Sequence, residues 1–582
     1  MCKRTKRLLC AAAALVLAVS GIQGGAAVLP LTGDIIASAE VTSGSCGESV
    51  NYELNGDVLT ISGTGDMDDY SLGRSPFLFF SDDVTKVVVS SGVTSIGDSA
   101  FYGFSNLQSL TLASTITDIG NYAFYGCGLE SVTVPGTVST VGDRAFSDCF
   151  KLTSAKLSSG VTELGDEAFA GCLNLFDVEF ADSVDYIGDG AFTDSSWLSR
   201  LSKNGLSVYN GFLLDGSGAS GAVSVPSGVK SVCGSAFSGN SAITSVVLPS
   251  GVKSVGDYAF KNCTGLTSVT LNSDLTDLGI GAFTGCTSLK SADLPAGLSC
   301  VPYGAFSGCK SLSAVSLSNN MSDISGYAFY NCKGLKSIEF LEGLAAIADH
   351  AFEGCTNLAE ISFPESVESI GTTAFESTKW FTEQKNASPL IIVNNIVVSG
   401  KRAKGLVAIP NGTKSISDRA FEGAAGITSV IIPESVTDIG SGAFLDCTSL
   451  TSVTVPSGVN SIGEAAFGFA TDKTTGEPTA VKGFVVRYVK GTEGENYASV
   501  NNILGMNYNN DSNQAVIVKS AAENIKPSNM KVTIYNEKGE TVKTVAPASD
   551  GTVNLSSLDE GKYDMVISCP DLAPLTLPYS AG

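Results

Sequence analysis

The chain has 582 residues, a formal net charge of −23 and a single histidine, and it is far longer than one compact core requires. Hydrophobic residues make up 43% of it and charged residues only 16%, which excludes a highly charged disordered chain. The acidic balance argues against nucleic-acid binding, which depends on Lys and Arg contacts to phosphates, and against docking on anionic lipid through a basic patch.

Residues 1–39 have the features of a secretory signal peptide. A basic start precedes the apolar run Leu8–Val19, and Ala37-Ser38-Ala39 is a small-residue cleavage site, with an earlier cut near Ala26-Ala27 as the alternative. Leu29–Gly33 matches the LPxTG sortase pattern but comes directly after the signal, so we interpret the match as a coincidence. No later apolar stretch is long enough to span a bilayer. We therefore expect a secreted, extracellular chain that is associated with a cell surface by other means, if at all.

Residues 40–85 have a pattern of their own. Residues 58–62 alternate apolar and hydroxyl side chains, as a strand does. Asn55-Gly56 indicates a hairpin turn between residues 52–54 and this strand. We predict an N-terminal β cap, which a stack of repeats needs to cover its first exposed coil.

Residues 86–467 repeat an Ala-Phe pair at intervals of 23 residues, once 22, and twice about double. A fixed period of this size is the mark of a repeat architecture, here with about 17 coils. The repeated phenylalanines are Phe101, Phe124, Phe146, Phe169, Phe192, Phe237, Phe260, Phe283, Phe306, Phe329, Phe352, Phe375, Phe421, Phe444 and Phe467.

One repeat, residues 263–283, shows the expected coil. Leu266, Val269 and Leu271 follow the Leu-x-x-Val-x-Leu pattern of a leucine-rich repeat, with a short strand whose apolar side chains alternate with polar ones. Gly279 is expected at a tight bend, and Phe283 is expected to pack between neighbouring coils. The predicted fold is a leucine-rich repeat solenoid of short parallel strands with a mostly irregular convex side.

The repeat is interrupted at residues 196–225 and again at 379–409. Each break begins with one of the two tryptophans, Trp197 and Trp380, and then has apolar strands around Asn210-Gly211 or Asn394-Asn395. Such pairs favour type I′ hairpins. Each break is therefore either a structural hairpin with the tryptophan packed under it or a protruding binding loop with an aromatic tip.

The C-terminal part lacks the Ala-Phe pair. Residues 468–512 are predicted to be a C-terminal cap, with a last strand over residues 484–488 and a short helix over 497–503. Residues 513–582 are predicted to form a small antiparallel β-sandwich-like domain, because residues 532–535, 542–545 and 563–567 alternate around a turn at Lys538-Gly539.

The cysteines follow the repeat. Nine of them lie three residues after a repeat phenylalanine: Cys127, Cys149, Cys172, Cys263, Cys286, Cys309, Cys332, Cys355 and Cys447. Because Ser195, Asn240, Ser377 and Ala424 stand near the same place in other coils, we favour reduced, buried thiols used as small fillers. Disulfides between stacked neighbours are the alternative, and zinc is less favoured because no C-x-x-C or Cys-His cluster occurs.

No set of catalytic residues is recognised. His350 stands at a variable position and is expected to be exposed and ordinary, which leaves a Ser-His-Asp triad without support. No phosphate-binding loop or dinucleotide fingerprint follows a strand. We therefore expect no catalytic, metal-binding or cofactor-binding residues and no cofactor.

The outward strand positions are the candidate ligand face. They are small, hydroxylic and sometimes acidic, so they are either a Ser/Thr ladder that solvates the sheet or a flat track for an extended partner. Ser429 and Thr454 are such positions in the late coils. The candidate residues, with the two tryptophans added, are Ser131, Thr133, Asp177, Glu179, Ser268, Thr270, Asp293, Glu339, Glu360, Trp197 and Trp380.

The segments "GITSVIIPESVTDIGSGAF" (426–444) and "SLTSVTVPSGVNSIGEAAF" (449–467) resemble the BspA-type leucine-rich repeats of bacterial cell-surface proteins. The resemblance implies a non-catalytic adhesion and interaction protein whose partner is a protein or glycan of a host or neighbouring cell. The alternative is a structural spacer that displays the C-terminal β domain.

Overall fold

The computed structural model describes residues 42–507, 516–517, 530–547, 552–553, 555, 558, 561–569 and 572–581. The predicted signal peptide, residues 1–39, lies outside the described residues. The chain divides into two compact units, Met1–Val315 and Ser316–Gly582, which are described separately. Within the described ranges, no helix has the length and apolar character needed to cross a membrane.

The first unit begins with the antiparallel strands β1 (Thr42–Ser45), β2 (Val50–Asn55) and β3 (Val58–Gly63). The predicted β2–β3 hairpin is confirmed, and Gly56 in its turn has a φ of +61°. Strand β3 then pairs in parallel with β5 (Lys86–Val89), so the repeat ladder starts on this small sheet. The 3-10 helix η1 (Leu78–Phe80) lies between them in sequence.

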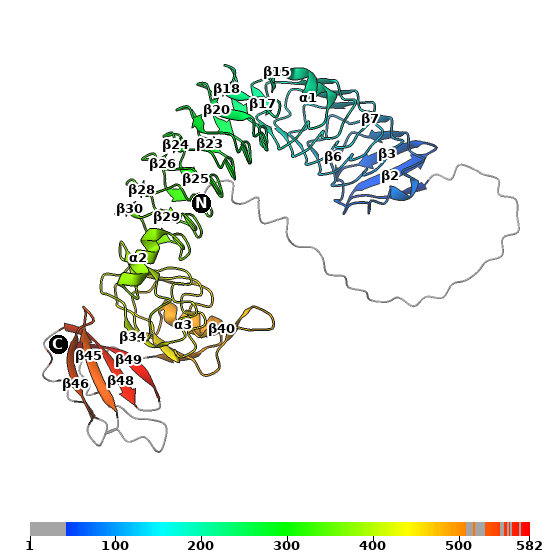
Figure 1. The fold of residues 1–582 in the computed structure, drawn as a ribbon. Helices are drawn as coiled ribbons and strands as arrows, with labels where there is room; N and C mark the ends of the chain where they lie inside the picture. The colour runs from blue at the N-terminus through cyan, green and yellow to red at the C-terminus, as the bar shows by residue number, and fades with distance from the viewer. Residues whose placement is uncertain are drawn as a thin grey trace, which may run out of the picture. The chain divides into compact units, whose positions relative to one another are not determined.

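Each coil contributes one longer strand to a parallel ladder, and Figure 1 shows such strands side by side at β18 and β20. Their outward side is called the strand face below. In the first unit these strands are β5, β7 (Ser109–Thr111), β9 (Ser131–Val134), β11 (Ser154–Leu157), β13 (Asp177–Phe180), β18 (Gly221–Ser224), β20 (Ile243–Val247), β22 (Ser268–Thr270) and β24 (Ser291–Asp293), with β26 (Ala314–Ser316) at the junction. In the second unit they are β28 (Ser337–Glu339), β30 (Glu360–Ser362), β34 (Gly405–Ala408), β36 (Ile427–Ile431), β38 (Ser452–Thr454), β42 (Val485–Tyr488) and β43 (Leu504–Asn507).

A second parallel ladder, made mostly of two-residue strands, runs along the other side of the coils. In the first unit its members are β4 (Gly65–Asp66), β6 (Val93–Ile96), β8 (Asp118–Ile119), β10 (Thr140–Val141), β12 (Glu163–Leu164), β14 (Tyr186–Ile187), β19 (Ser231–Val232), β21 (Ser254–Val255), β23 (Asp277–Leu278) and β25 (Cys300–Val301). In the second unit they are β27 (Asp323–Ile324), β29 (Ala346–Ile347), β31 (Ser369–Ile370), β35 (Ser415–Ile416), β37 (Asp438–Ile439) and β39 (Ser461–Ile462). This ladder was not predicted from the sequence.

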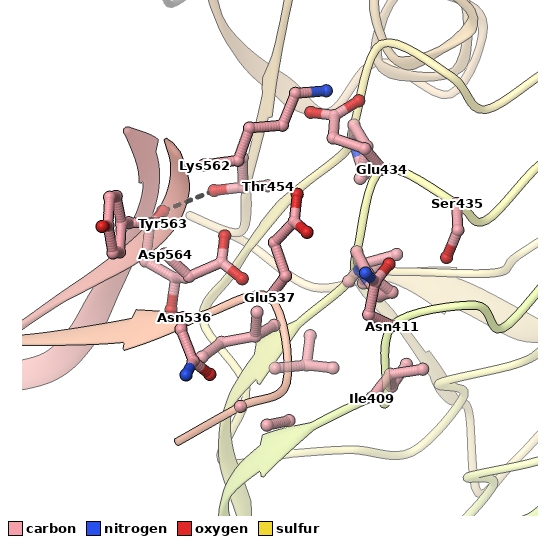
Figure 2. Close-up of a pocket in the computed structure, with 18 of the residues that line it drawn as sticks. Ile409, Asn411, Glu434, Ser435, Thr454, Asn536, Glu537, Lys562, Tyr563 and Asp564 are labelled. Atoms are coloured by element: carbon pink, nitrogen blue, oxygen red, sulfur yellow. Dashed lines mark hydrogen bonds between the residues drawn. The ribbon is translucent and has the colours of Figure 1, made fainter. Parts of the chain in front are cut away.

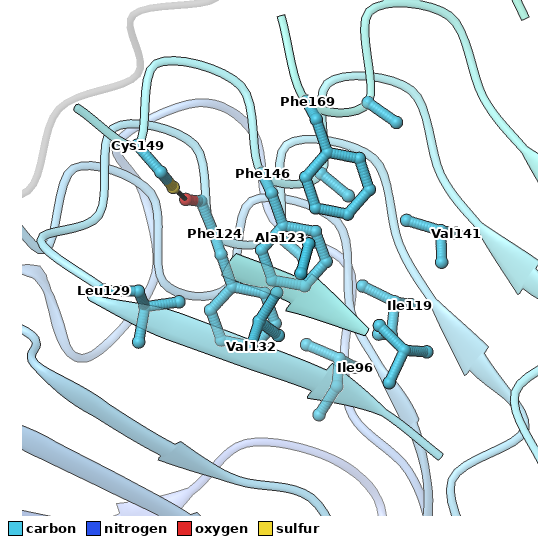
Figure 3. Packing of buried hydrophobic residues seen from close by; sticks show 14 of the residues in the cluster. Ile96, Ile119, Ala123, Phe124, Leu129, Val132, Val141, Phe146, Cys149 and Phe169 are labelled. Carbon is cyan, nitrogen blue, oxygen red and sulfur yellow. Dashed lines mark hydrogen bonds between the residues drawn. The ribbon is translucent and has the colours of Figure 1, made fainter. Parts of the chain in front are cut away.

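The core is a row of stacked phenylalanine rings, as predicted. Phe124 and Phe146 lie 5.2 Å apart with planes 7° from parallel, and Phe146 and Phe169 repeat this spacing (Figure 3). Burying a phenylalanine contributes about 1.5–3 kcal/mol. Phe77, which precedes the repeats, stacks on Phe101 at 5.4 Å and so covers the first ring. The backbone follows the same order, since the Phe124 amide donates to the Ala145 carbonyl of the next coil at 2.7 Å.

The cysteines have a further role in this core. The twelve cysteines whose side chains the structure describes are buried, and each is a thiol rather than half of a disulfide. The Cys149 thiol donates to the Phe124 carbonyl of the preceding coil at 3.3 Å, as Figure 3 shows, and Cys309 does the same to Phe283. Asn240, at the equivalent place, donates to the Gly216 carbonyl. The position therefore favours a donor, which adds a second hydrogen bond to a buried carbonyl that already accepts one from a backbone amide.

Glycine at the bend is explained by neighbouring coils rather than by a positive φ. A Cβ added to Gly279 would lie 2.3 Å from the backbone carbon of Gly256, its equivalent one coil earlier. In other coils, the residue that follows the equivalent glycine forms a hydrogen bond to the next coil. The Asp166 carboxylate accepts from the Asp189 amide at 2.7 Å, and the Asn121 side-chain oxygen accepts from the Asp143 amide at 2.8 Å.

Both interruptions contain the predicted hairpins. Strands β16 (Leu206–Tyr209) and β17 (Phe212–Asp215) form the first, and β32 (Ile391–Val393) and β33 (Ile396–Ser399) form the second. The φ values of Asn394 and Asn395 are +44° and +65°, as type I′ turns require. β15 (Ser202–Lys203) pairs with β16, while β17 and β33 continue in parallel into β19 and β35. Each hairpin thus begins a new stretch of the second ladder.

A short helix precedes each hairpin and was not predicted. Helix α1 (Ser196–Leu201) is capped by Ser195, and α2 (Lys379–Ala387) by Thr378. Both caps stand three residues after a repeat phenylalanine, so the cysteine position is converted into a helix N-cap. Thr378, rather than Ser377, is the equivalent residue in the second break.

The repeats end in strands β42 and β43, with the hairpin β40 (Phe469–Thr471) and β41 (Pro478–Ala480) as an excursion. Helix α3 spans Glu493–Val500, so the prediction of residues 497–503 placed it too late in the chain. Glu493 and Glu495 in its first turn favour the earlier start through the helix dipole.

The C-terminal region forms an antiparallel sheet in the order β46 (Thr541–Val545), β45 (Lys531–Asn536), β48 (Gly561–Cys569) and β49 (Leu572–Ala581). A second pair, β44 (Val516–Ile517) and β47 (Thr552–Val553), contributes Val553 to the same small core as Val532 and Ile567. The sandwich-like arrangement and the turn at Lys538-Gly539 agree with the prediction. Strand β49 was missed because two prolines interrupt its sequence, which an edge strand tolerates.

Candidate functional site

The strand face is open in the first unit. Strands β9, β11 and β13 align so that Ser131, Ser154 and Asp177 form one row, and Thr133, Lys156 and Glu179 form the next. Lys156 and Glu179 form an ion pair at 3.0 Å that leaves both side chains more than half exposed, so it contributes little to stability. The candidate residues of these coils and of the later coils in this unit are all exposed: Ser131, Thr133, Asp177, Glu179, Ser268, Thr270 and Asp293.

In the second unit the strand face is open over β28 and β30. Glu339 and Glu360 are exposed there, and the paired rows are Ser337 with Glu360 and Glu339 with Ser362. Each row thus places one carboxylate beside one hydroxyl group.

The late coils depart from this pattern. Ser429 and Thr454, expected on the open face, are 3% and 7% exposed. Their hydroxyl groups contact strand β49: Ser429 Oγ lies 2.8 Å from Thr576 Oγ1, and Thr454 Oγ1 donates to the Thr576 carbonyl at 2.6 Å. The expectation that these two residues are open was therefore wrong, because the C-terminal sheet covers the strand face over β36 and β38.

The tryptophans do not form an exposed aromatic tip. Trp197 is 5% exposed and packs against Phe192, Phe180 and Tyr209, with ring centroids 4.8, 6.4 and 5.3 Å away. Trp380 is half-buried against Phe375. As candidate ligand residues they are corrected here. Each tryptophan is packed inside its break, as the structural interpretation proposed, but it lies in a helix that was not predicted and packs on the last phenylalanine of a stack.

His350 is not the exposed residue that was expected. Its ring is half-buried, stacks on Tyr327 with centroids 4.5 Å apart, and contacts the Glu353 carboxylate through Nδ1. Tyr327 and Glu353 lie outside the strands, and together they hold the His350 ring by packing and by one carboxylate.

Burial governs the titration of the core thiols. It raises the pKa of Cys309 and of Cys447 to about 12. Since the thiolate is the reactive form, these cysteines are inert while the coil is folded. Among the described residues, no group of three or more His, Cys, Asp or Glu side chains has the arrangement of a metal site.

An apolar margin beside Asp177 was not predicted from the sequence. Phe150, Leu173 and Phe176 are 53%, 54% and 50% exposed on neighbouring coils. Phe150 and Leu173 each come directly after a repeat cysteine, where the other coils have small or polar residues. Comparing equivalent positions would have revealed them. Large exposed apolar side chains that gather in this way mark interaction surfaces.

The family model described as the BspA type leucine rich repeat region matches six copies, over residues 75–199, 217–332, 293–396 and 404–475. Among solved structures, the chain is similar to a leucine-rich repeat protein from Eubacterium ventriosum, at 25% identity and a TM-score of 0.38, over 58% of this chain and 95% of that one. A leucine-rich repeat protein from Bacteroides ovatus has 23% identity and a TM-score of 0.29, over 73% of this chain and 95% of that one. A leucine rich cell surface protein from Faecalibacterium prausnitzii has 22% identity and a TM-score of 0.30, over 56% and 95%. No curated protein matches the chain. Because the family model matches most of the chain and follows its repeats, the chain belongs to the BspA-type leucine-rich repeat family.

Proposed function

We propose that this chain is a secreted or surface-exposed, non-catalytic interaction protein that binds a protein or glycan of a host or neighbouring cell. The supporting observation is the open strand face over β9, β11 and β13, where hydroxyl groups and carboxylates stand in rows beside exposed Phe150, Leu173 and Phe176. Aromatic anchors next to polar groups are typical of binding surfaces.

The face suits an extended partner. Ser131, Thr133 and Ser154 have short side chains, so a strand or glycan chain can approach this part of the sheet closely and bond to their hydroxyl groups. The contact with β49 shows that hydroxyl groups of this ladder can hold an extended segment, since Thr454 bonds to a backbone carbonyl. We infer the same kind of bonding for a partner on the open coils.

The test compares two double variants of the full chain on an array of purified extracellular proteins and glycans. Asp177→Lys with Glu179→Lys changes the strand face, and Asp182→Lys with Asp185→Lys changes the same coil by the same charge at exposed positions outside the strand face. We expect the first variant to lose at least ten-fold in affinity for the bound probe and the second to bind nearly as the native chain does. Equal binding by both variants would refute the proposed face.

The alternative is a structural spacer that displays the C-terminal β domain, residues 513–582. In that case removal of this domain would abolish binding, while the strand-face variant would bind normally. The proposed function requires the reverse. The burial of Ser429 and Thr454 under β49 favours the proposed binding function over the spacer, because a domain that is only displayed does not need to cover the strand face.

A further inference from the structure

A cavity of about 320 Å³ lies inside the second unit, between the late coils and the C-terminal sheet (Figure 2). This volume is within the range of small-molecule sites. Two segments far apart in the sequence form its walls: residues 408–457 from the coils and residues 536–576 from the C-terminal sheet. It is separate from the open strand face of the proposed function.

One side of the cavity is apolar. Ala408, Ile431, Pro433 and Pro456 line it, from the outward face of the late strands and the turns that come after them, whereas Ile409, Val430 and Ile432 belong to the core behind this wall. The side chains of the wall offer an aliphatic surface to an unbranched carbon chain, and each methylene buried there contributes about 0.8 kcal/mol.

The rest of the lining is polar and acidic. Glu434 follows β36, Glu537 follows β45, and Asp564 lies in β48, so three separate segments bring carboxylates to one cavity. Figure 2 shows the side chains of Glu537 and Asp564 directed into the space in front of the coils, with Glu434 at its edge. Among the lining residues that the structure describes, Lys562 is the one basic residue.

The environment of Asp564 fits a cationic guest. Burial raises the pKa of Asp564 to about 7, and the negative charge of Glu434 adds to the effect. The charged groups that line the cavity with this carboxyl are Glu434 from the coils, Glu537 from the hairpin turn and Lys562 from its own strand, while the Tyr563 ring packs on the core of the C-terminal sheet. A cation placed among the three carboxylates would favour the ionised form of Asp564.

We propose that this cavity binds a primary ammonium group carried on a short aliphatic chain, with the chain on the apolar wall and the ammonium group among Glu434, Glu537 and Asp564. An anionic ligand would meet an excess of negative charge, and an uncharged one would leave three carboxylates partly desolvated without compensation. The same chemistry is present in a free alkyl diamine and in the lysine side chain of a peptide.

The experiment titrates the full chain by calorimetry with cadaverine, with a blocked alanine peptide containing one lysine, and with 1-pentanol. We expect cadaverine, the peptide or both to bind, and the alcohol to bind at least ten-fold more weakly. Tighter binding of cadaverine identifies a free amine as the ligand, and tighter binding of the peptide identifies a protein segment. Equal binding of the alcohol, or no binding of either amine, would overturn the proposal.

Variants locate the site. Glu434→Gln and Asp564→Asn should each weaken amine binding at least ten-fold, whereas Glu477→Gln, an exposed carboxylate outside the cavity, should leave it unchanged. Titrations near pH 7 in two buffers of different ionisation heat should show that amine binding releases protons, and Asp564→Asn should abolish this release. Proton release that persists in Asp564→Asn, or unchanged affinity in both cavity variants, would contradict the assignment even though the native chain binds amines.

Discussion

Replacement of Phe283 by alanine tests the stacked core most sharply. The ring is fully buried, and its centroid lies 5.1 Å from that of Phe260 and 5.3 Å from that of Phe306, with planes 2° and 7° from parallel. Because both neighbours are held by their own coils, the cavity left by the ring cannot close. Large-to-small substitutions of buried phenylalanine cost about 3–5 kcal/mol, and the two lost ring contacts, at about 0.5–1.5 kcal/mol each, place this site in the upper half of that range.

The assay is native-state hydrogen exchange of the amides around the substitution. The Phe260 and Phe283 amides donate to the alanine carbonyls of the next coils at 2.8 and 2.7 Å, so their opening free energies report local stability. We expect these free energies to fall by about 4 kcal/mol in Phe283→Ala. The matched control is Phe79→Ala, because Phe79 is 95% exposed and its loss should cost less than about 0.5 kcal/mol. A fall below about 1 kcal/mol at Phe283 would refute the stacking argument.

Three further predictions concern polar and titratable groups. Burial raises the pKa of Asp166 above its usual value, so its ionised form opposes folding and this penalty grows as the pH rises through that pKa. Asp166→Asn keeps an oxygen that accepts from the Asp189 amide, as Asn121 accepts from the Asp143 amide. This variant should therefore be as stable as the native chain, or more stable, in urea unfolding at pH 7. Asp166→Ala removes the acceptor and should lower the free energy of unfolding by about 1 kcal/mol. Cys309 should resist iodoacetamide at about pH 8 in the folded chain and react after unfolding, because burial raises its pKa to about 12. Mass analysis measures the labelling, and rapid labelling of the folded chain would contradict the burial of this thiol. In the described part of the chain, Nε and Nη1 of Arg487 are buried without hydrogen-bond partners, and burial lowers the pKa of this group to about 10. Arg487→Met should leave the thermal midpoint unchanged or raise it, and the difference should stay constant at neutral pH and shrink only as the pH rises above about 10. A large loss of stability would show that the charge has an unidentified partner.

The repeating parts of the fold could be predicted because the same physical demand recurs in each coil. Phe283 occupies a position that fifteen coils fill with phenylalanine, and Leu266 and Val269 occupy positions that most coils fill with aliphatic side chains. The Asn394-Asn395 pair sets its hairpin locally through positive φ values. The second ladder has strands of only two residues, such as Asp277–Leu278, which are too short to show an alternating pattern.

Features that depend on contacts between distant segments could not be predicted. The N-caps Ser195 and Thr378 follow from local chemistry and were visible in principle. By contrast, the burial of Thr454 depends on a strand that begins more than a hundred residues later and contains prolines. The same holds for the cavity, whose carboxylates approach one another only when the C-terminal sheet packs on the coils.

Hydrogen exchange over the whole folded chain, measured peptide by peptide, tests the solenoid most directly. If each coil bonds to the next through its Ala-Phe segment, slow exchange must recur about every 23 residues, at Phe124, Phe146, Phe169 and onward. Outward residues of the turns must exchange quickly between these maxima. Protection spread evenly along the chain, or confined to one compact region, would contradict the account.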